Sequence, residues 1–197
     1  MKYNHPLPEI LGVSEVVRSR LFKVEGVDLK FSNGVRTTYE RLAGGNGAVM
    51  VIPYDSDRKS FVFTREYCVG TEKYELGFVK GKIDDGENPL QAAERELAEE
   101  IGLGADRFEL LRTLNFAPGF MGLKLHLVLA TGIRERKLDS GDEPEPIERE
   151  YVVLENLENL LYSDDSELCE ARCITGIILA LRKLNITLTP QIIVSNF

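Results

Sequence analysis

Histidines, cysteines and basic residues are few in this 197-residue chain, and each shortage narrows the chemistry that it can perform. Two histidines, His5 and His126, are too few for a His-rich zinc site and make Ser-His-Asp catalysis improbable. The three cysteines contain no CxxC pair. Cys169 and Cys173 lie in an apolar, helix-like stretch, where we expect buried thiols, and the odd cysteine count suits a reducing compartment.

Positive charge is also in deficit, since 24 Lys and Arg residues stand against 32 Asp and Glu residues, a net charge of −8. Recognition of nucleic-acid phosphates needs the opposite balance, so we expect no nucleic-acid partner. Long apolar runs are missing: Ile174–Leu181 is too short to cross a bilayer, and Met1–Glu9 has no signal-peptide core. We therefore expect a cytoplasmic protein without a membrane partner.

The patterning that remains is that of a globular mixture of strands and helices. Hydrophobic residues make up 43% and charged residues 28% of the chain. Asn33-Gly34 is a strong two-residue hairpin signal, and a strand pair is expected across Asp55-Ser56-Asp57. The segments with strand patterns are Val13–Glu40, Ala48–Pro53, Ser60–Thr64, Phe108–Leu114 and Leu123–Ala130. Interleaved with helices, they predict an α/β sandwich.

Two helices are predicted, the first from signals at both of its ends and the second from its amphipathic pattern. Pro89–Ile101 has Asn88 as a candidate N-cap, Gln91 in a variant of the capping box and Gly102 just after its end. A second amphipathic helix is expected over Asp165–Lys183, after an acidic loop over Lys137–Glu150.

Three carboxylates gather on one face of the first helix. Glu96, Glu99 and Glu100 are three and four residues apart, so their side chains meet away from the apolar stripe. Like charges at this spacing repel one another, and a divalent cation removes the penalty. A solvated acidic face would look the same, so the triplet alone does not decide between the two readings. If it binds Mg²⁺, three glutamates are enough for two or more ions.

The segment around this helix, GKIDDGENPLQAAERELAEEIGL, resembles the Nudix box at every fixed position, from Gly81 through Glu87 and Arg95-Glu96 to Leu103. The resemblance implies the Nudix fold, a mixed β-sheet sandwiched between helices, with an N-terminal antiparallel sheet element. It also implies Mg²⁺ or Mn²⁺ as the cofactor. Glu96, Glu99 and Glu100 would be its ligands, with the backbone carbonyl of Lys80. Arg95 and Glu87 would form an ion pair that orients the helix.

The resemblance extends over most of the chain to the bacterial ADP compounds hydrolases, a Nudix group similar to ADP-ribose pyrophosphatases. Tyr74–Glu87, Asp142–Ile147 and Glu170-Ala171-Arg172 contribute to it, and Pro118 stands 15 residues after the box, as in ADP-ribose enzymes. It implies hydrolysis of ADP-ribose, NADH or adenosine dinucleotides to AMP and a phosphorylated product. Residues 1–45 would form a dimerisation element, and residues 46–197 would form the hydrolase domain of a homodimer.

A general base must accept the proton of the attacking water, and with so few histidines we expect a loop carboxylate. By alignment with ADP-ribose enzymes Glu145 is the first candidate and Glu143 the second, while Glu99 would act in catalysis through the metal. For the ADP-linked substrate we expect contacts from basic residues and from the loop proline, namely Arg65, Arg18, Arg20 and Pro118.

Two further readings stay open. Cys68 stands where ADP-ribose enzymes often carry arginine, and the stretch before Gly81 is longer than usual, so the preferred substrate could be NADH, a dinucleotide or a sugar nucleotide. The chain could also be a nucleotide-sensing domain that has the Nudix fold without turnover. The complete glutamate set argues against the sensor, because crowded carboxylates without a metal are destabilising.

Overall fold

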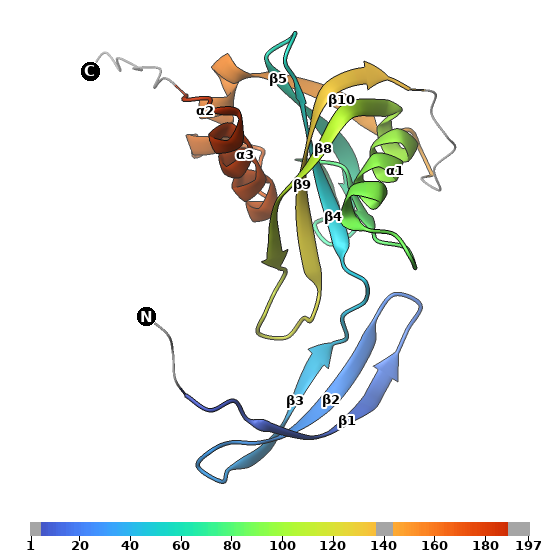
Figure 1. The fold of residues 1–197 in the computed structure, drawn as a ribbon, viewed down its shortest axis with the longest axis vertical. Coiled ribbons are helices and arrows are strands. Elements are labelled where there is room, and N and C mark those ends of the chain that lie inside the picture. Colours follow the sequence, from blue (N-terminus) through green and yellow to red (C-terminus); the bar gives the residue numbers. More distant parts are fainter. Residues whose placement is uncertain (1–4, 137–143, 189–197) are drawn as a thin grey trace, which may run out of the picture. The chain divides into compact units, whose positions relative to one another are not determined.

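The computed structural model describes residues 5–136 and 144–188 of the chain. Its contacts divide the chain into two compact units, whose ribbons are drawn in Figure 1. The first unit holds the described residues up to Gly47 together with Asn115–Lys124. The second unit holds Ala48–Leu114 and the described residues from Leu125 onward.

The first unit is an antiparallel sheet of three strands in the order β1-β2-β3, which are Glu9–Arg18, Lys23–Lys30 and Arg36–Leu42. The turn between β2 and β3 falls at the predicted Asn33-Gly34, and Gly34 has a φ of +86°, which suits glycine. The N-terminal antiparallel sheet element that the family resemblance implies is confirmed, and β1 adds a third strand to the predicted hairpin.

The loop between the long strands β8 (Leu103–Asn115) and β9 (Lys124–Glu135) belongs to this first unit. The Leu42 amide donates to the Phe120 carbonyl at 2.8 Å, and the Gly122 amide donates to the Leu42 carbonyl at 3.2 Å. The loop is therefore an extension of the β3 end of the sheet.

The second unit is built on a seven-stranded mixed sheet with the order β10-β5-β4-β9-β8, to which β6 adds beside β5 and β7 beside β4. Strand β4 pairs parallel with β9 and antiparallel with β5 and β7. The bounds not yet given are β4 Ala48–Asp55, β5 Ser60–Cys68, β6 Lys73–Gly77, β7 Lys80–Lys82 and β10 Glu148–Val153. The predicted strand pair across Asp55-Ser56-Asp57 is confirmed.

Helices cover both faces of this sheet, as the ribbon in Figure 1 shows. Helix α1 (Pro89–Ile101) covers one face, and helices α2 (Leu154–Tyr162) and α3 (Ala171–Leu184) cover the other. Strand β4 contributes side chains to the buried clusters on both faces of the sheet, because alternate side chains of a strand point to opposite faces. Met50 and Ile52 pack in one buried cluster with Ile177 of α3, and Val51 packs in the other with Leu97 of α1. The predicted sandwich is confirmed.

The second predicted helix begins later than expected, at Ala171 rather than Asp165. The Ser166 hydroxyl bonds the Leu160 carbonyl at 2.5 Å and accepts from the Leu168 amide at 3.1 Å, so a local turn replaces the first helical turns. Cys169 therefore lies outside the helix and is exposed, whereas Cys173 is buried as expected. Burial raises the pKa of the Cys173 thiol to about 12.

The predicted acidic loop over Lys137–Glu150 ends earlier than expected, because its last residues form the start of β10. Glu150 pairs with Phe63 of β5 in the sheet register, so its backbone is a strand. Residues 137–143 lie outside the described part of the chain. None of the helices that the structure describes is both long and apolar enough to cross a membrane.

Candidate active site

Helix α1 is fixed at both ends by the predicted signals. The Asn88 side chain accepts from the amides of Leu90 and Gln91, and the Gln91 side chain accepts from the Asn88 amide at 2.9 Å. Gly102 ends the helix in the left-handed conformation, with a φ of +61°. The buried residues of the helix are Ala92, Ala93, Leu97, Ala98 and Ile101. Its carboxylates lie beside this packed stripe rather than fully in solvent.

Arg95 is the centre of the ion pairs around α1. Its guanidinium donates to both carboxylate oxygens of Glu87 at 2.9 Å and to the Lys82 carbonyl at 2.9 Å. The predicted pair of Arg95 and Glu87 is confirmed, and it ties the helix to the loop before it. The hydrogen bonds from Arg95 lower the pKa of Glu87, and the same contact raises the pKa of Arg95.

The same guanidinium holds two of the predicted metal ligands side by side. Nη1 of Arg95 donates to Glu96 at 2.8 Å and to Glu99 at 3.1 Å. The Glu96 side chain is only 12% exposed, and burial raises its pKa although Arg95 opposes the shift. Glu100, the third predicted ligand, is half-buried on the same helix. The region thus concentrates negative charge in partly desolvated surroundings.

Strand β7 brings backbone against these carboxylates. A Cβ added at Gly81 would lie 1.8 Å from the carboxyl carbon of Glu96, so only glycine leaves room for that carboxylate. The peptide that joins Lys80 to Gly81 therefore lies against Glu96.

The register of β7 also determines the direction in which the Lys80 carbonyl points. The Val51 amide donates to the Val79 carbonyl at 2.9 Å, and Met50 stands opposite Lys80. Ladder bonds alternate along an antiparallel pair, so the carbonyl of Lys80 points away from β4. Such an oxygen is available to a ligand.

These oxygen donors fit a hard divalent cation. Mg²⁺ takes octahedral oxygen ligands, commonly one or two carboxylates with water and substrate phosphate completing the set. Within the residues described, no three Asp, Glu, His or Cys side chains converge closely enough to form a complete metal cage. Arg95 instead stands between Glu96 and Glu99. These protein oxygens therefore match a Mg²⁺ site in which water and substrate phosphate supply the remaining ligands.

The structure brings Arg65 and Glu145 together at a second place in the same unit. Both line a small hollow of about 110 Å³ beside Tyr67 and Ile147. The Tyr74 hydroxyl lies 2.5 Å from the Glu145 carboxylate and donates to it. Glu145 is therefore held by a neutral donor at the edge of β6.

Arg65 is already engaged in ion pairs. Its guanidinium contacts Glu150 at 2.8 Å and Glu167 at 2.9 Å, and its side chain is 27% exposed. Burial opposes the charged form, but the two carboxylates outweigh it and raise the pKa of Arg65. A substrate phosphate that used Arg65 would compete with these carboxylates.

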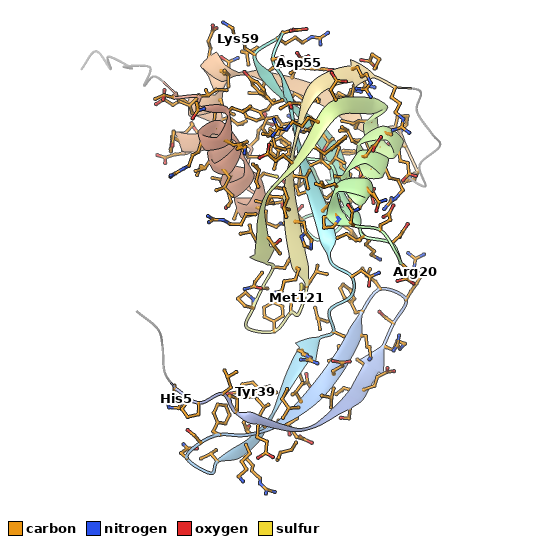
Figure 2. All side chains as sticks on the ribbon, in the orientation of Figure 1. His5, Arg20, Tyr39, Asp55, Lys59 and Met121 are labelled. Carbon is orange, nitrogen blue, oxygen red and sulfur yellow. The ribbon has the colours of Figure 1, made fainter. Side chains whose placement is uncertain are left out.

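The remaining predicted residues are not assembled with α1 within one unit. Arg18 pairs with Glu15 at 2.9 Å in the first unit, and Arg20 is exposed between β1 and β2 (Figure 2). Pro118 lies in the turn that follows Ala117, also in the first unit. Glu143, the second candidate base, lies outside the described residues.

Several neighbours of the site were missed by sequence reasoning. Tyr74 contacts Glu145 across 71 positions of the chain, and Glu167 contacts Arg65 across 102. Tyr74 opens one of the stretches that carry the family resemblance, which was the available signal. Nothing in the spacing pointed to Glu167.

Comparison with known proteins identifies two family segments. Residues 8–41 match the model described as the NudE-type Nudix hydrolase N-terminal domain, and residues 46–173 match the NUDIX domain. The second match alone covers more than half of the chain. The two segments divide the sequence between β3 and β4.

Individual relatives agree with these segments. The ADP compounds hydrolase NudE of Escherichia coli K12 is 46% identical over 173 residues, covering 87% of this chain and 90% of the relative. A protein of Bacillus methanolicus named methanol dehydrogenase activator is 27% identical over 168 residues, covering 85% and 89%. A crystal structure of an ADP compounds hydrolase has a TM-score of 0.84 and 43% identity, covering 93% of this chain and 97% of the other.

Proposed function

Because the chain belongs to the Nudix family, we propose that it is a divalent-metal-dependent pyrophosphatase of ADP-linked compounds. The reaction adds water across the P–O–P linkage and releases AMP and a phosphorylated product. The observation that carries the proposal is that Arg95 holds the Glu96 and Glu99 carboxylates side by side, with Glu96 against Gly81. The similarity to ADP compounds hydrolases over most of the chain supports the substrate class.

The family generally requires a divalent cation, and we assign Mg²⁺ or Mn²⁺ to the oxygens of Glu96, Glu99, Glu100 and the Lys80 carbonyl. Three glutamates are more ligands than one Mg²⁺ commonly takes from a protein, which favours two or more ions. When bound, the cations would neutralise the pyrophosphate and lower the pKa of the attacking water. Arg95 and Glu87 hold the helix so that these oxygens stay in place.

Glu145 is our first choice for the general base, with Glu143 second. Glu145 is exposed, lines a hollow beside Arg65 and accepts a hydrogen bond from Tyr74, so it is open to water. In the proposed reaction it takes the proton of the attacking water. Arg65 would contact the substrate once a phosphate displaces Glu150 or Glu167.

We propose that residues 1–45 form a dimerisation element and residues 46–197 the hydrolase domain. The two family segments support this division. Arg18, Arg20 and Pro118 remain our proposed additional contacts to the substrate. Three unpaired cysteines favour the cytoplasm as the place of action.

The test is a panel of ADP-ribose, NADH, diadenosine polyphosphates and a sugar nucleotide, assayed with Mg²⁺ and with EDTA. We expect AMP release only with the metal, and the ratios of kcat/KM rank the substrates. Hydrolysis in ¹⁸O-water, followed by mass spectrometry, identifies the phosphorus that is attacked.

A regulatory role is the second candidate, because one relative is named as an activator of another enzyme. Metal-dependent binding of ADP-ribose without AMP release would favour it over the hydrolase.

A further inference from the structure

An ion pair lies behind the candidate metal site, on the opposite face of the sheet from α1. Nζ of Lys80 lies 3.4 Å from the Glu170 carboxylate and donates to the Phe78 carbonyl at 2.8 Å. The two side chains are only 25% and 24% exposed, so solvent screens the pair weakly. Arg172 forms a further ion pair with Glu170.

The residues around the Lys80–Glu170 pair leave just enough space for it. A Cβ at Gly77 would meet the Lys80 ammonium at 3.0 Å and the Glu170 carboxylate at 3.7 Å. Glu170 occupies the N-cap position of α3, the helix that packs closely on β4. A Cβ at Gly176 of that helix would meet Met50 at 3.0 Å, which shows how close the two elements are. Glu170 therefore stands at the start of a helix that is packed against β4.

Lys80 connects this fixed carboxylate to the metal side of the sheet. Its side chain shares a face with Met50, its partner in the register, and reaches towards α3. The next residue, Gly81, faces the Glu96 carboxylate on α1. The strand that supplies both is only three residues long, and among the described strands it pairs with β4 only. So short a strand at an edge needs an additional anchor.

We propose that Glu170 is a positioning residue that holds the Lys80 ammonium and thereby keeps the Lys80 carbonyl at the metal site. The proposal rests on the proposed function, which places that carbonyl among the ligands. Without the ion pair, β7 loses its anchor on the α3 side, and the carbonyl loses its fixed position against Glu96. Partners of metal ligands commonly change metal affinity by 10- to 100-fold when they are replaced.

The experiment compares Mn²⁺ binding to the full chain and to Glu170→Gln, measured from the electron paramagnetic resonance signal of free Mn²⁺ without substrate. We expect the variant to bind Mn²⁺ about tenfold more weakly, at the lower end for a partner of a ligand. In the assay, the Mg²⁺ concentration for half-maximal activity should rise by a similar factor, while kcat recovers at saturating metal. A general loss of folding would instead lower activity at every metal concentration.

Lys80→Met, which keeps the backbone carbonyl, should weaken Mn²⁺ binding to the same extent. In the double variant the two effects on Mn²⁺ binding should not add, because both variants remove the same Lys80–Glu170 ion pair. Lys183→Met is the matched control: it removes an ion pair with Glu109 at the other end of α3 and should leave Mn²⁺ binding unchanged. If a charge variant folds poorly, Gly77→Ala crowds the ammonium without a charge change and should shift Mn²⁺ binding in the same direction.

Unchanged Mn²⁺ affinity in Glu170→Gln and Lys80→Met would overturn the inference, as would fully additive losses in the double variant. Failure of the original chain to bind Mn²⁺, or to hydrolyse any compound of the panel, would instead reject the proposed function. The two failures are therefore distinguishable.

Discussion

The Arg95 guanidinium lies between two carboxylates that we assign to the metal. Without this positive charge, the two carboxylates should repel each other. Arg95→Gln leaves Glu96 and Glu99 without this cation, so we expect activity to fall about 10- to 100-fold. The melting temperature should fall without metal and recover in part when Mg²⁺ is added. Arg107→Gln removes an exposed pair with Glu109 and serves as the control. An equal Mg²⁺-induced shift in Arg95→Gln and the original chain would contradict the assignment.

Glu145 is the residue at which the proposed chemistry can be separated from metal binding. Glu145→Gln keeps an acceptor for the Tyr74 hydroxyl but cannot take a proton. We expect kcat to fall by about 10²- to 10⁴-fold, the usual contribution of a general base, with Mn²⁺ affinity unchanged. Glu148→Gln, an exposed carboxylate three positions further along, should keep its activity. Equal turnover of Glu145→Gln and the original chain would reject Glu145 and leave Glu143 to be tested.

Among the strand connections, the β4–β5 hairpin is fixed by Asp55, which is labelled in Figure 2. Burial opposes ionisation of this 5%-exposed residue, but bonds from the Arg58 side chain and the amides of Asp57 and Arg58 together lower its pKa. A carboxyl whose pKa is lowered by folding stabilises the native state above its ordinary pKa of 3.8 and loses that contribution below it.

Asp55→Asn keeps an acceptor for the amides but offers Arg58 no charge. We expect it to lower the free energy of unfolding by about 1 kcal/mol at pH 7. Urea unfolding at several pH values should show this difference shrinking as the pH falls below 3.8. The exposed neighbour variant Asp57→Asn should show no comparable difference. If the free energy of unfolding of Asp55→Asn stayed lower by the same amount down to pH 2, the charge of Asp55 would not be the cause of the difference.

Local signals decided which elements could be predicted from the sequence. The bounds of α1 were correct because Asn88, Pro89 and Gly102 act within one helical turn of its ends. The start of α3 was wrong because the Ser166 turn competes with the helix through contacts to Leu160 that periodicity does not reveal. Strand β10 was missed altogether, because its partner strand, β5, lies far away in the sequence.

Across the molecule, the same difference between local and long-range contacts applies to the candidate site. It separates the carboxylates of α1 from the surroundings of Arg65 and Glu145. Helical spacing was enough to predict that Glu96 and Glu99 lie side by side, because both belong to one short segment with Arg95. It did not produce a cage of three carboxylates among the described residues. The surroundings of Arg65 and Glu145 depend on pairings between distant strands and helices, which spacing does not specify. What the sequence left open is therefore set by the tertiary fold.

The association of whole chains is testable through the apolar surface of the first unit. A groove of about 530 Å³ in this unit is lined by Ile10, Leu29 and Tyr39 among others, and Ile10 is 60% exposed. Apolar side chains exposed together on a small sheet favour a partner surface, and we propose a second copy. Light scattering should therefore give twice the chain mass of 22.1 kDa.

Ile10→Lys places a charge in this groove and should shift the mass towards one chain at micromolar concentration, because an unpaired charge is costly to bury. Val35→Lys is the matched control, since Val35 is 54% exposed but does not line the groove. If Arg18 or Arg20 of one chain serves the site of the other, Ile10→Lys should also raise KM, and higher protein concentration should restore it. A single-chain mass in the original protein, unchanged by concentration, would refute the dimer while leaving the assignment of the metal ligands intact.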